Sequence, residues 1–146
     1  MTVRVFRANG DIHIEYYPKT ASTLFTTNEP VALDTTGTLI PYTPGLAAPF
    51  LGVIKKAVTA TDSDYASTTR VPVEVGNPDT EWLIDATTTA AAATDVGEYV
   101  DYVEATISVN VGASNQNDCY VTQLISSTLV VVKFARLVSS ITSTLE

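Results

Sequence analysis

The stretch RVPVEVGNPDTEWLID, residues 70–85, decides the fold class. Starting at Val71, three valines recur at every second position, which is the period of a β-strand that buries one face. The turn residues Gly-Asn-Pro-Asp at 76–79 end that strand, and the next strand is predicted over 81–85. Pro72 cannot donate a backbone hydrogen bond, so it indicates either an edge position or an unpaired N–H side.

Segments of the same kind continue in both directions. Short apolar, β-branched runs alternate with turn residues at intervals of roughly 8–12 residues, which is typical of a small β-barrel or sandwich. Only residues 86–97 (ATTTAAAATDVG) have helical character, and one or two helical turns are expected there. Gly52, inside an apolar run, indicates a bulge or a close approach of backbones. Further strands are predicted over 31–33, 38–42, 50–59, 99–103, 107–111, 119–125 and 129–134.

The predicted fold is therefore all-β, with an additional N-terminal hairpin. Residues 2–7 (TVRVFR) and 11–17 (DIHIEYY) both alternate, and the Asn-Gly pair between them is a strong hairpin signal. Residues 18–30 are polar and rich in threonine, and they predict a linker or an extended arm. The predicted organisation is a hairpin and arm over 1–30, a β-barrel domain over 31–137 and a C-terminal tail over 138–146.

Charge and composition narrow the classes of partner. The chain has 146 residues, of which 45% are hydrophobic and only 16% charged, and its net charge is −8. Because Lys and Arg are scattered, binding to nucleic acid through phosphates is not expected. No run approaches the roughly 20 apolar residues of a membrane span, and no signal peptide is expected behind Arg4 and Arg7. Cys119 is the only cysteine, which fits synthesis in a reducing cytoplasm.

Few residues could carry chemistry. A nucleophile–base pair would need the fold to bring His13, the only histidine, to Cys119. The simpler interpretation is a packed cysteine and a solvent-facing histidine. Asp62 and Asp64 share a loop that could hold a hard cation, but the loop lacks the Ca²⁺-binding pattern, so solvated acids are expected. The same holds for the acids around Trp82, which are Asp79, Glu81 and Asp85. We expect no enzyme activity, no cofactor and no metal site.

Aromatic residues leave two interpretations open. The chain has 7 Tyr, 4 Phe and 1 Trp. Tyrosine suits protein interfaces because its ring can be buried while its hydroxyl stays hydrogen-bonded, but the same residues could cap the ends of a barrel. Trp82 is expected to pack in the core, whereas an exposed Trp82 or a tyrosine shelf would favour sugar binding.

Residues 50–85 and 94–137 share a set of short elements with one known class of protein. The elements are FLGV at 50–53, VPVEV at 71–75, TDVGEYVD at 94–101 and VVVKF at 130–134. In pattern and composition these segments resemble the decoration (cement) proteins of tailed-phage capsids, which have a small β-barrel or β-tulip fold. The first 30 residues lie outside the resemblance.

The resemblance implies a structural protein of the virion, made in the host cytoplasm and bound to the capsid exterior. It implies a homotrimer that binds the major capsid protein and bridges adjacent capsomers, where repeated weak contacts add up. Extended arms could add strands to neighbouring sheet edges. One alternative is another virion component, such as a head-fibre base or a tail protein. A second is a carbohydrate-binding surface module.

Residues 1–30 are the predicted contact region, because an isolated hairpin is marginally stable in water and needs a partner surface. The low charge of the chain agrees with a surface that other proteins cover. The predicted interface residues are the apolar side chains Val3, Val5, Phe6, Ile12, Ile14, Tyr16, Tyr17, Leu24 and Phe25.

Overall fold

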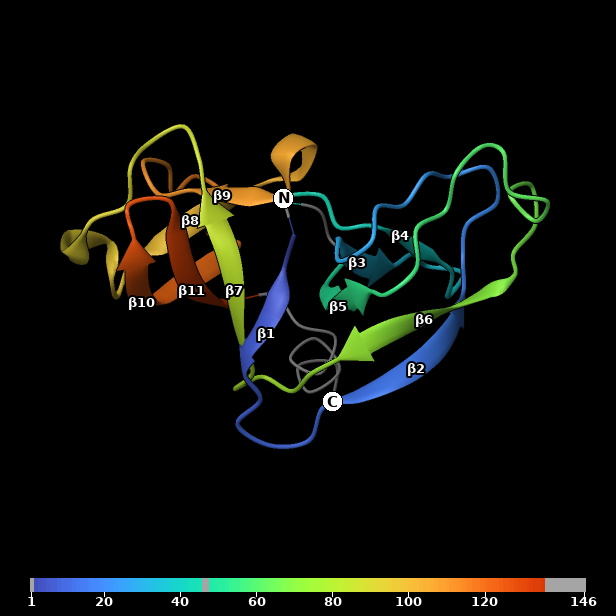
Figure 1. The fold of residues 1–146 in the computed structure, drawn as a ribbon, viewed down its shortest axis with the longest axis horizontal. Coiled ribbons are helices and arrows are strands. Elements are labelled where there is room, and N and C mark those ends of the chain that lie inside the picture. Colours follow the sequence, from blue (N-terminus) through green and yellow to red (C-terminus); the bar gives the residue numbers. More distant parts are fainter. Residues whose placement is uncertain (1, 46–47, 136–146) are drawn as a thin grey trace.

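The computed structural model describes residues 2–45 and 48–135. These residues form eleven strands in two sheets with two 3-10 turns, so the predicted all-β class with a barrel is confirmed (Figure 1). The strands are β1 (Arg4–Arg7), β2 (His13–Pro18), β3 (Pro30–Leu33), β4 (Leu39–Pro41), β5 (Phe50–Ile54), β6 (Arg70–Val75), β7 (Glu81–Ala86), β8 (Tyr99–Val103), β9 (Ser108–Asn110), β10 (Cys119–Ser126) and β11 (Leu129–Phe134).

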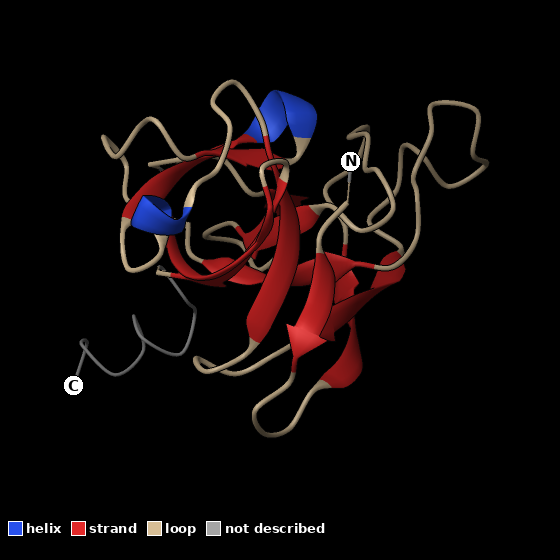
Figure 2. Cartoon of the chain, turned by 60° about the vertical axis from the view of Figure 1, so that its left-hand side comes forward, coloured by secondary structure: helices blue, strands red, loops and turns tan. Residues whose placement is uncertain are grey.

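The first sheet closes into a barrel, on the left of Figure 1. Its strand order is β1-β7-β11-β10-β8-β9, and a parallel pairing between β7 and β9 joins the two sides. The end of β7 pairs with β9, whereas its beginning pairs with β1, so β1 is an extra strand beside the closed set. Figure 2 shows these strands curving round a common interior. Closure removes most of the free edges that a sheet would otherwise expose.

The second sheet stays open, with the order β2-β6-β5-β3-β4, and it lies on the right of Figure 1. Strand β5 is buried along its whole length. Its Phe50 and Val53 belong to the barrel-side core, while Leu51 and Ile54 belong to a second cluster on the other face. Burial on both faces explains why β5 is a continuous apolar run in the sequence. At Gly52 an added Cβ would lie 2.3 Å from the carbonyl oxygen of Glu74, so the predicted close approach is confirmed.

The N-terminal segment is not a hairpin, which corrects the sequence prediction. Strand β1 pairs antiparallel with β7, and β2 pairs antiparallel with β6. The two connections, over residues 8–12 and 76–80, therefore run side by side from one sheet to the other. Asn9 and Gly10 do adopt positive φ, at 51° and 134°. The turn chemistry is present, but strands distant in the sequence supply the hydrogen-bond partners.

Side-chain hydrogen bonds tie the two connections together. Asn77 Nδ2 donates to the carbonyl oxygens of Ala8 and Asp11, and Asn9 Nδ2 donates to that of Asp79. Thr80 Oγ1 also donates to the Ala8 carbonyl, at 3.1 Å. Residues 1–30 thus contribute a strand to each sheet, where the sequence had indicated a separate hairpin and arm. The predicted tail, 138–146, lies outside the described residues.

Three smaller predictions are refined. The run 50–59 ends as a strand at Ile54, and Val58 instead forms an isolated bridge with Phe25. The helical segment is a single 3-10 turn, Ala93–Asp95, and the sequence did not indicate a second one at Glu104–Thr106. Pro72 lies in an interior strand next to the point where β5 ends, so its missing N–H interrupts little pairing.

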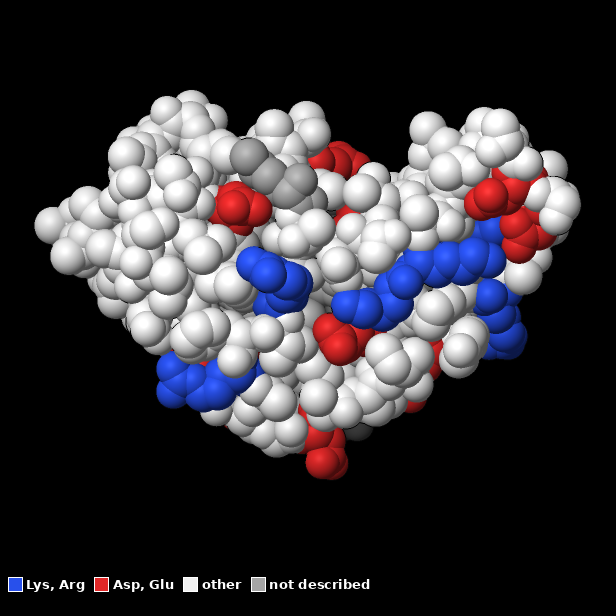
Figure 3. All heavy atoms as spheres, viewed as in Figure 1, with Lys and Arg blue, Asp and Glu red and all other residues white. Residues whose placement is uncertain are grey.

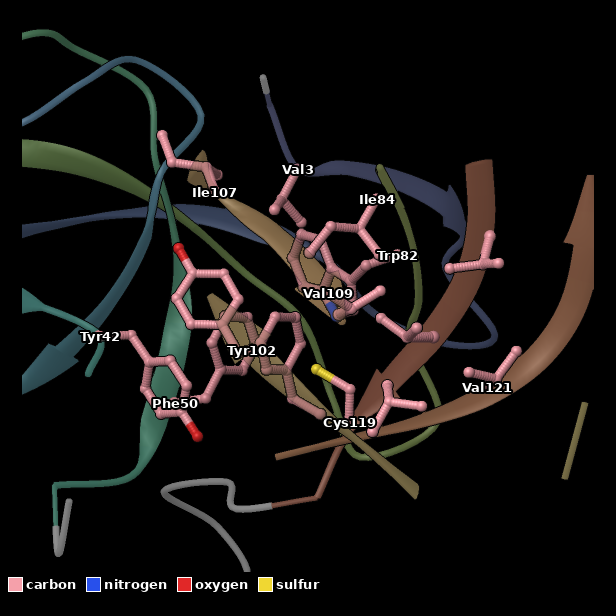
Figure 4. Packing of buried hydrophobic residues seen from close by; sticks show 14 of the residues in the cluster. Val3, Tyr42, Phe50, Trp82, Ile84, Tyr102, Ile107, Val109, Cys119 and Val121 are labelled. Carbon is pink, nitrogen blue, oxygen red and sulfur yellow. The ribbon is translucent and has the colours of Figure 1, made fainter. Parts of the chain in front are cut away.

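An aromatic cluster joins the barrel to the open sheet (Figure 4). Phe50 of β5 stacks on Phe134 of β11, with ring centroids 3.8 Å apart and an interplanar angle of 8°. Trp82 meets Phe50 edge-to-face and is 1% exposed, so its predicted place in the core is confirmed. Tyr42 contacts Phe50, Phe134 and Tyr102. The two lobes therefore share one core.

Candidate interaction surface

Cys119 and His13 lie in different parts of the fold. Cys119 is fully buried in the barrel core, and this burial raises the pKa of its thiol well above the usual value. A thiol that is protonated and shielded from solvent is a poor nucleophile. His13 is exposed on β2 of the open sheet, where its Nε2 lies 2.9 Å from Glu15 Oε1. The predicted packed cysteine and solvent-facing histidine are both confirmed.

Three of the acidic residues singled out in the sequence, Asp62, Asp79 and Glu81, have side-chain partners in the structure. Asp62 accepts hydrogen bonds from the backbone N–H and the hydroxyl of Thr59, which lower the pKa of its carboxyl. Asp79 lies on the surface, 3.7 Å from the amine of Lys133. Across residues 2–45 and 48–135, no three His, Cys, Asp or Glu side chains are grouped closely enough to hold a metal ion.

Glu81 anchors the junction between the sheets. Its carboxylate accepts hydrogen bonds from Asn9 and Thr122 at 2.8 and 2.9 Å, and Arg7 Nε lies 3.0 Å away. Burial opposes ionisation of Glu81, but the hydrogen bonds and the charge of Arg7 together keep its pKa below the usual value. This acid therefore ties Arg7 of β1 and Asn9 of the following connection to the start of β7.

Two buried polar side chains organise the interior. Lys19 is fully buried, and its Nζ donates to the carbonyl oxygens of Asp64, Tyr65 and Ser67 at 2.8, 3.1 and 2.6 Å. It thereby fastens the loop between β5 and β6. Asp118 is also fully buried and accepts from the Tyr42 hydroxyl, the Gly45 N–H and the Tyr102 N–H. Neither residue was singled out in the sequence, because nothing local distinguishes them from surface charges.

The nine predicted interface residues divide by exposure. Val3 and Phe25 are buried in the chain's own core, so the structure places neither at the surface. Three are half-buried against the core: Val5, Ile12 and Tyr17. Four are exposed: Phe6 (40%), Ile14 (48%), Tyr16 (60%) and Leu24 (60%). Folding thus leaves four of the nine predicted interface residues exposed.

Strand β2 turns apolar side chains outward. Ile14 and Tyr16 lie opposite Glu74 and Pro72 of β6, on one face of the sheet. The other face of β2 carries His13, Glu15 and Tyr17, opposite the valines of β6. On a solvated strand the opposite arrangement is usual, with apolar side chains against the core. We name the exposed pair Ile14 and Tyr16 the β2 patch.

A hydrogen-bonded trio fixes the polar face of β2. The Tyr17 hydroxyl and His13 Nε2 both contact the carboxylate of Glu15. The hydrogen bond from Tyr17, together with that from His13, lowers the pKa of Glu15. Partial burial, followed by the bond to Glu15, raises the pKa of Tyr17 to about 12. The trio is therefore a carboxylate held between two donors of the same strand, which fixes these three side chains relative to one another.

The barrel exposes apolar side chains that the sequence analysis missed. Val96, Tyr99 and Ile125 are 41%, 48% and 43% exposed. Tyr99 and Tyr120 pack edge-to-face with ring centroids 5.2 Å apart. Tyr99 begins β8, and the alternation of that strand buries Val100 and Tyr102 and leaves Tyr99 outside. Figure 3 shows that much of the barrel lobe carries uncharged side chains on the face drawn there.

Comparisons with known proteins give no further assignment. The chain matches no protein-family model and no curated protein sequence. Among the described residues, the structure contains no helix with the length and apolar character needed to cross a membrane.

Proposed function

We propose that this chain is a virion structural protein, a capsid decoration (cement) protein that binds the outside of the capsid and bridges adjacent capsomers. The observation that carries the proposal is the exposed apolar set on the N-terminal strands, Phe6, Ile14 and Tyr16. Apolar side chains that stay exposed after folding favour contact with another protein, because that contact removes them from water.

The N-terminal strands are well suited to that task. They lie at the outer side of both sheets, β1 beside β7 and β2 beside β6, so a partner that binds them meets both lobes. The low share of charged residues lowers the desolvation cost of covering the surface. The resemblance of residues 50–85 and 94–137 to decoration proteins points the same way. In this role the chain acts through contact area and avidity, as a homotrimer on the major capsid protein.

Co-sedimentation tests the proposal. Purified chain is mixed with undecorated shells assembled from a tailed-phage major capsid protein, and binding is measured against protein concentration. We expect saturable binding that falls at least tenfold when Phe6, Ile14, Tyr16 and Leu24 are replaced by serine. The matched control replaces Val96 and Ile125, which have similar exposure on the barrel, and it should bind as the unmodified chain does. Absence of binding to shells at any concentration would contradict the proposal.

The alternatives have their own outcomes. A head-fibre base or tail protein would bind a fibre or tail component and leave the shells bare. Trp82 is buried and cannot stack on a sugar, so carbohydrate binding would depend on Tyr99, which is exposed and packs against Tyr120. Saturable glycan binding that is lost on Tyr99→Ala would favour that function.

A further inference from the structure

The β2 edge differs from the other strand edges in the described part of the chain. Edge strands normally carry charges, bulges, prolines or a covering segment, which prevent pairing with other chains. Strand β1 carries Arg4 and Arg7, and its pairing with β7 is interrupted by a bulge. Strand β4 has only three residues and ends in Pro41, and Lys19 and Thr20 cover it. Strand β2 also carries a charge at Glu15 and ends in Pro18, but it pairs with β6 over six residues without a bulge, and no backbone pairing covers its outer edge among the described residues.

The direction of the backbone groups on β2 follows from its neighbours. The Pro72 carbonyl accepts from Lys55 N–H, so Pro72 points its backbone groups away from β2. Its partner Tyr16 must then point its own N–H and C=O away from β6, since opposite residues in an antiparallel pair share this direction. By alternation, Ile14 does the same. The groups of Ile14 and Tyr16 therefore lie on the open side of the sheet.

One of these groups has a side-chain partner. Arg70 Nη1 donates to the Tyr16 carbonyl at 3.0 Å. The Ile14 N–H, the Ile14 C=O and the Tyr16 N–H have no partner among the described residues, and the β2 patch lies directly beside them. The edge thus offers hydrogen-bonding groups next to apolar side chains, which is the combination that β-strand addition uses.

We infer that β2 pairs with β2 of a second copy of this chain, antiparallel about a two-fold axis that passes between the two Ile14 residues. In this register Ile14 forms reciprocal backbone hydrogen bonds with its own counterpart, as an isologous interface requires. His13 of each copy lies opposite Glu15 of the other, so the polar faces are complementary. On the apolar face, Tyr16 lies opposite Ile12 of the other copy.

Charge selects this register over its nearest competitor. An axis through Glu15 would place the two Glu15 carboxylates opposite each other, and like charges directly across a strand pair are destabilising. The register centred on Ile14 avoids that clash and joins the two open sheets into one. The contact shares Ile14 and Tyr16 with the surface assigned to capsid binding, but it is measured without shells, so its failure can be told apart from failure of the proposed function.

Sedimentation velocity over a range of concentrations is the first test. The unmodified chain should self-associate, and Ile14→Pro should lower its mass to that of the unpaired species. Proline at position 14 removes an N–H that points away from β6 and an exposed side chain, and it leaves the β2–β6 hydrogen bonds in place, so the urea midpoint of this variant should stay close to that of the unmodified chain. Ile125→Ser, which removes a comparably exposed side chain, should leave the mass unchanged. Equal masses for the unmodified chain and Ile14→Pro would overturn the inference and leave the edge to a strand from a different protein.

Charge exchange tests the register. His13→Glu should raise the dissociation constant about tenfold, because it places a second carboxylate opposite Glu15 of the other copy. Adding Glu15→Lys to the same chain should restore pairing. If the double variant associates no better than the single one, the register is wrong.

Oxidative cross-linking gives an independent reading. In the proposed register the two Cα atoms at position 14 lie about 5.5 Å apart, within disulfide range. Ile14→Cys should therefore form a covalent dimer faster than Tyr16→Cys, and the buried Cys119 should not compete. Faster cross-linking of Tyr16→Cys would exclude an axis through Ile14.

Discussion

The two lobes differ in how the edges of their β-sheets end. The barrel closes on itself through the β7–β9 pairing, and its interior is filled with large aromatic rings. The open sheet keeps two edges, and its second core cluster is mostly aliphatic, with a buried lysine fastening the nearby loop. Closure places nearly all backbone groups in hydrogen bonds, whereas the open sheet leaves β2 free to pair.

This difference assigns separate tasks to the lobes. The barrel supplies rigidity because its strands cannot separate without breaking the closed set. The open sheet supplies contact, because its β2 edge and β2 patch remain available after folding. Because Phe50 of the open sheet packs on Phe134 of the barrel, unfolding of either lobe breaks the shared aromatic cluster.

The largest effect is expected where the lobes meet. Phe50→Ala removes the ring that stacks on Phe134, and large-to-small changes of this kind cost about 3–5 kcal/mol. Urea unfolding followed by Trp82 fluorescence and by circular dichroism should give one shared, lowered midpoint. Phe6→Ala, at an exposed ring, is the control and should cost less than about 1 kcal/mol. Separate transitions for the two probes would mean that the lobes unfold independently.

The next effect concerns the open sheet. Lys19→Met keeps the length of the side chain but removes the donor to three buried-loop carbonyls. Hydrogen bonds to a charged group contribute about 1.5–3 kcal/mol each, with partial recovery through water, so we expect a loss of roughly 3 kcal/mol. Amide exchange should increase in residues 60–69 more than in the barrel. Lys55→Met, at a partly exposed amine, should cost far less.

A comparable test applies to the barrel. In the folded chain one carboxylate oxygen of Asp118 accepts from Tyr42 and Gly45, and the other accepts from Tyr102. Asp118→Asn replaces one of these oxygens by an NH2 group, which then faces a donor instead of accepting from it. Leaving a buried donor unsatisfied costs about 1–3 kcal/mol, so the unfolding free energy should fall by roughly 2 kcal/mol. Asp79→Asn, at a surface carboxyl, is the matched control. Equal losses for both variants would show that the buried hydrogen bonds do not carry the effect.

The smallest effect is a pH dependence at Glu29, just before β3. Burial raises the pKa of its carboxyl from 4.5 to about 7. The folded chain therefore binds an extra proton between these values, and this group's contribution to stability falls as pH rises from about 4.5 to 7. Glu29→Gln should remove that decline and stabilise the chain by roughly 1–2 kcal/mol at pH 8. Thermal unfolding at pH 5 and pH 8 measures it. If the variant shows the same difference in unfolding temperature between pH 5 and pH 8 as the unmodified chain, Glu29 is not the source of that difference.

Strand positions follow from the sequence far better than strand pairings do. Strands β6, β8 and β11 match their predicted bounds, because side-chain alternation is a property of neighbouring residues. The hairpin prediction was wrong even though Asn9 and Gly10 adopt turn conformations. An Asn-Gly turn reverses or redirects the chain equally well, and its local sequence does not tell which strand lies beside it.

The candidate surface shows the same division. The alternation of residues 11–17 correctly placed Ile14 and Tyr16 on one side of a strand and His13 and Glu15 on the other. It did not show which side meets the core. That choice depends on β6, whose valines face the polar side of β2, and on Arg70, which reaches back to Tyr16.

Periodicity, turn residues and composition were enough for an all-β chain with strands near their observed positions, since each signal acts over a few residues. The closure of the barrel, the crossing of the N-terminal segment between sheets and the burial of Lys19 and Asp118 arise from contacts between distant segments. A lysine has the same local pattern whether water or three carbonyls surround its amine. Its environment is set when the whole chain packs, because the free energy of burial depends on every group that replaces the water.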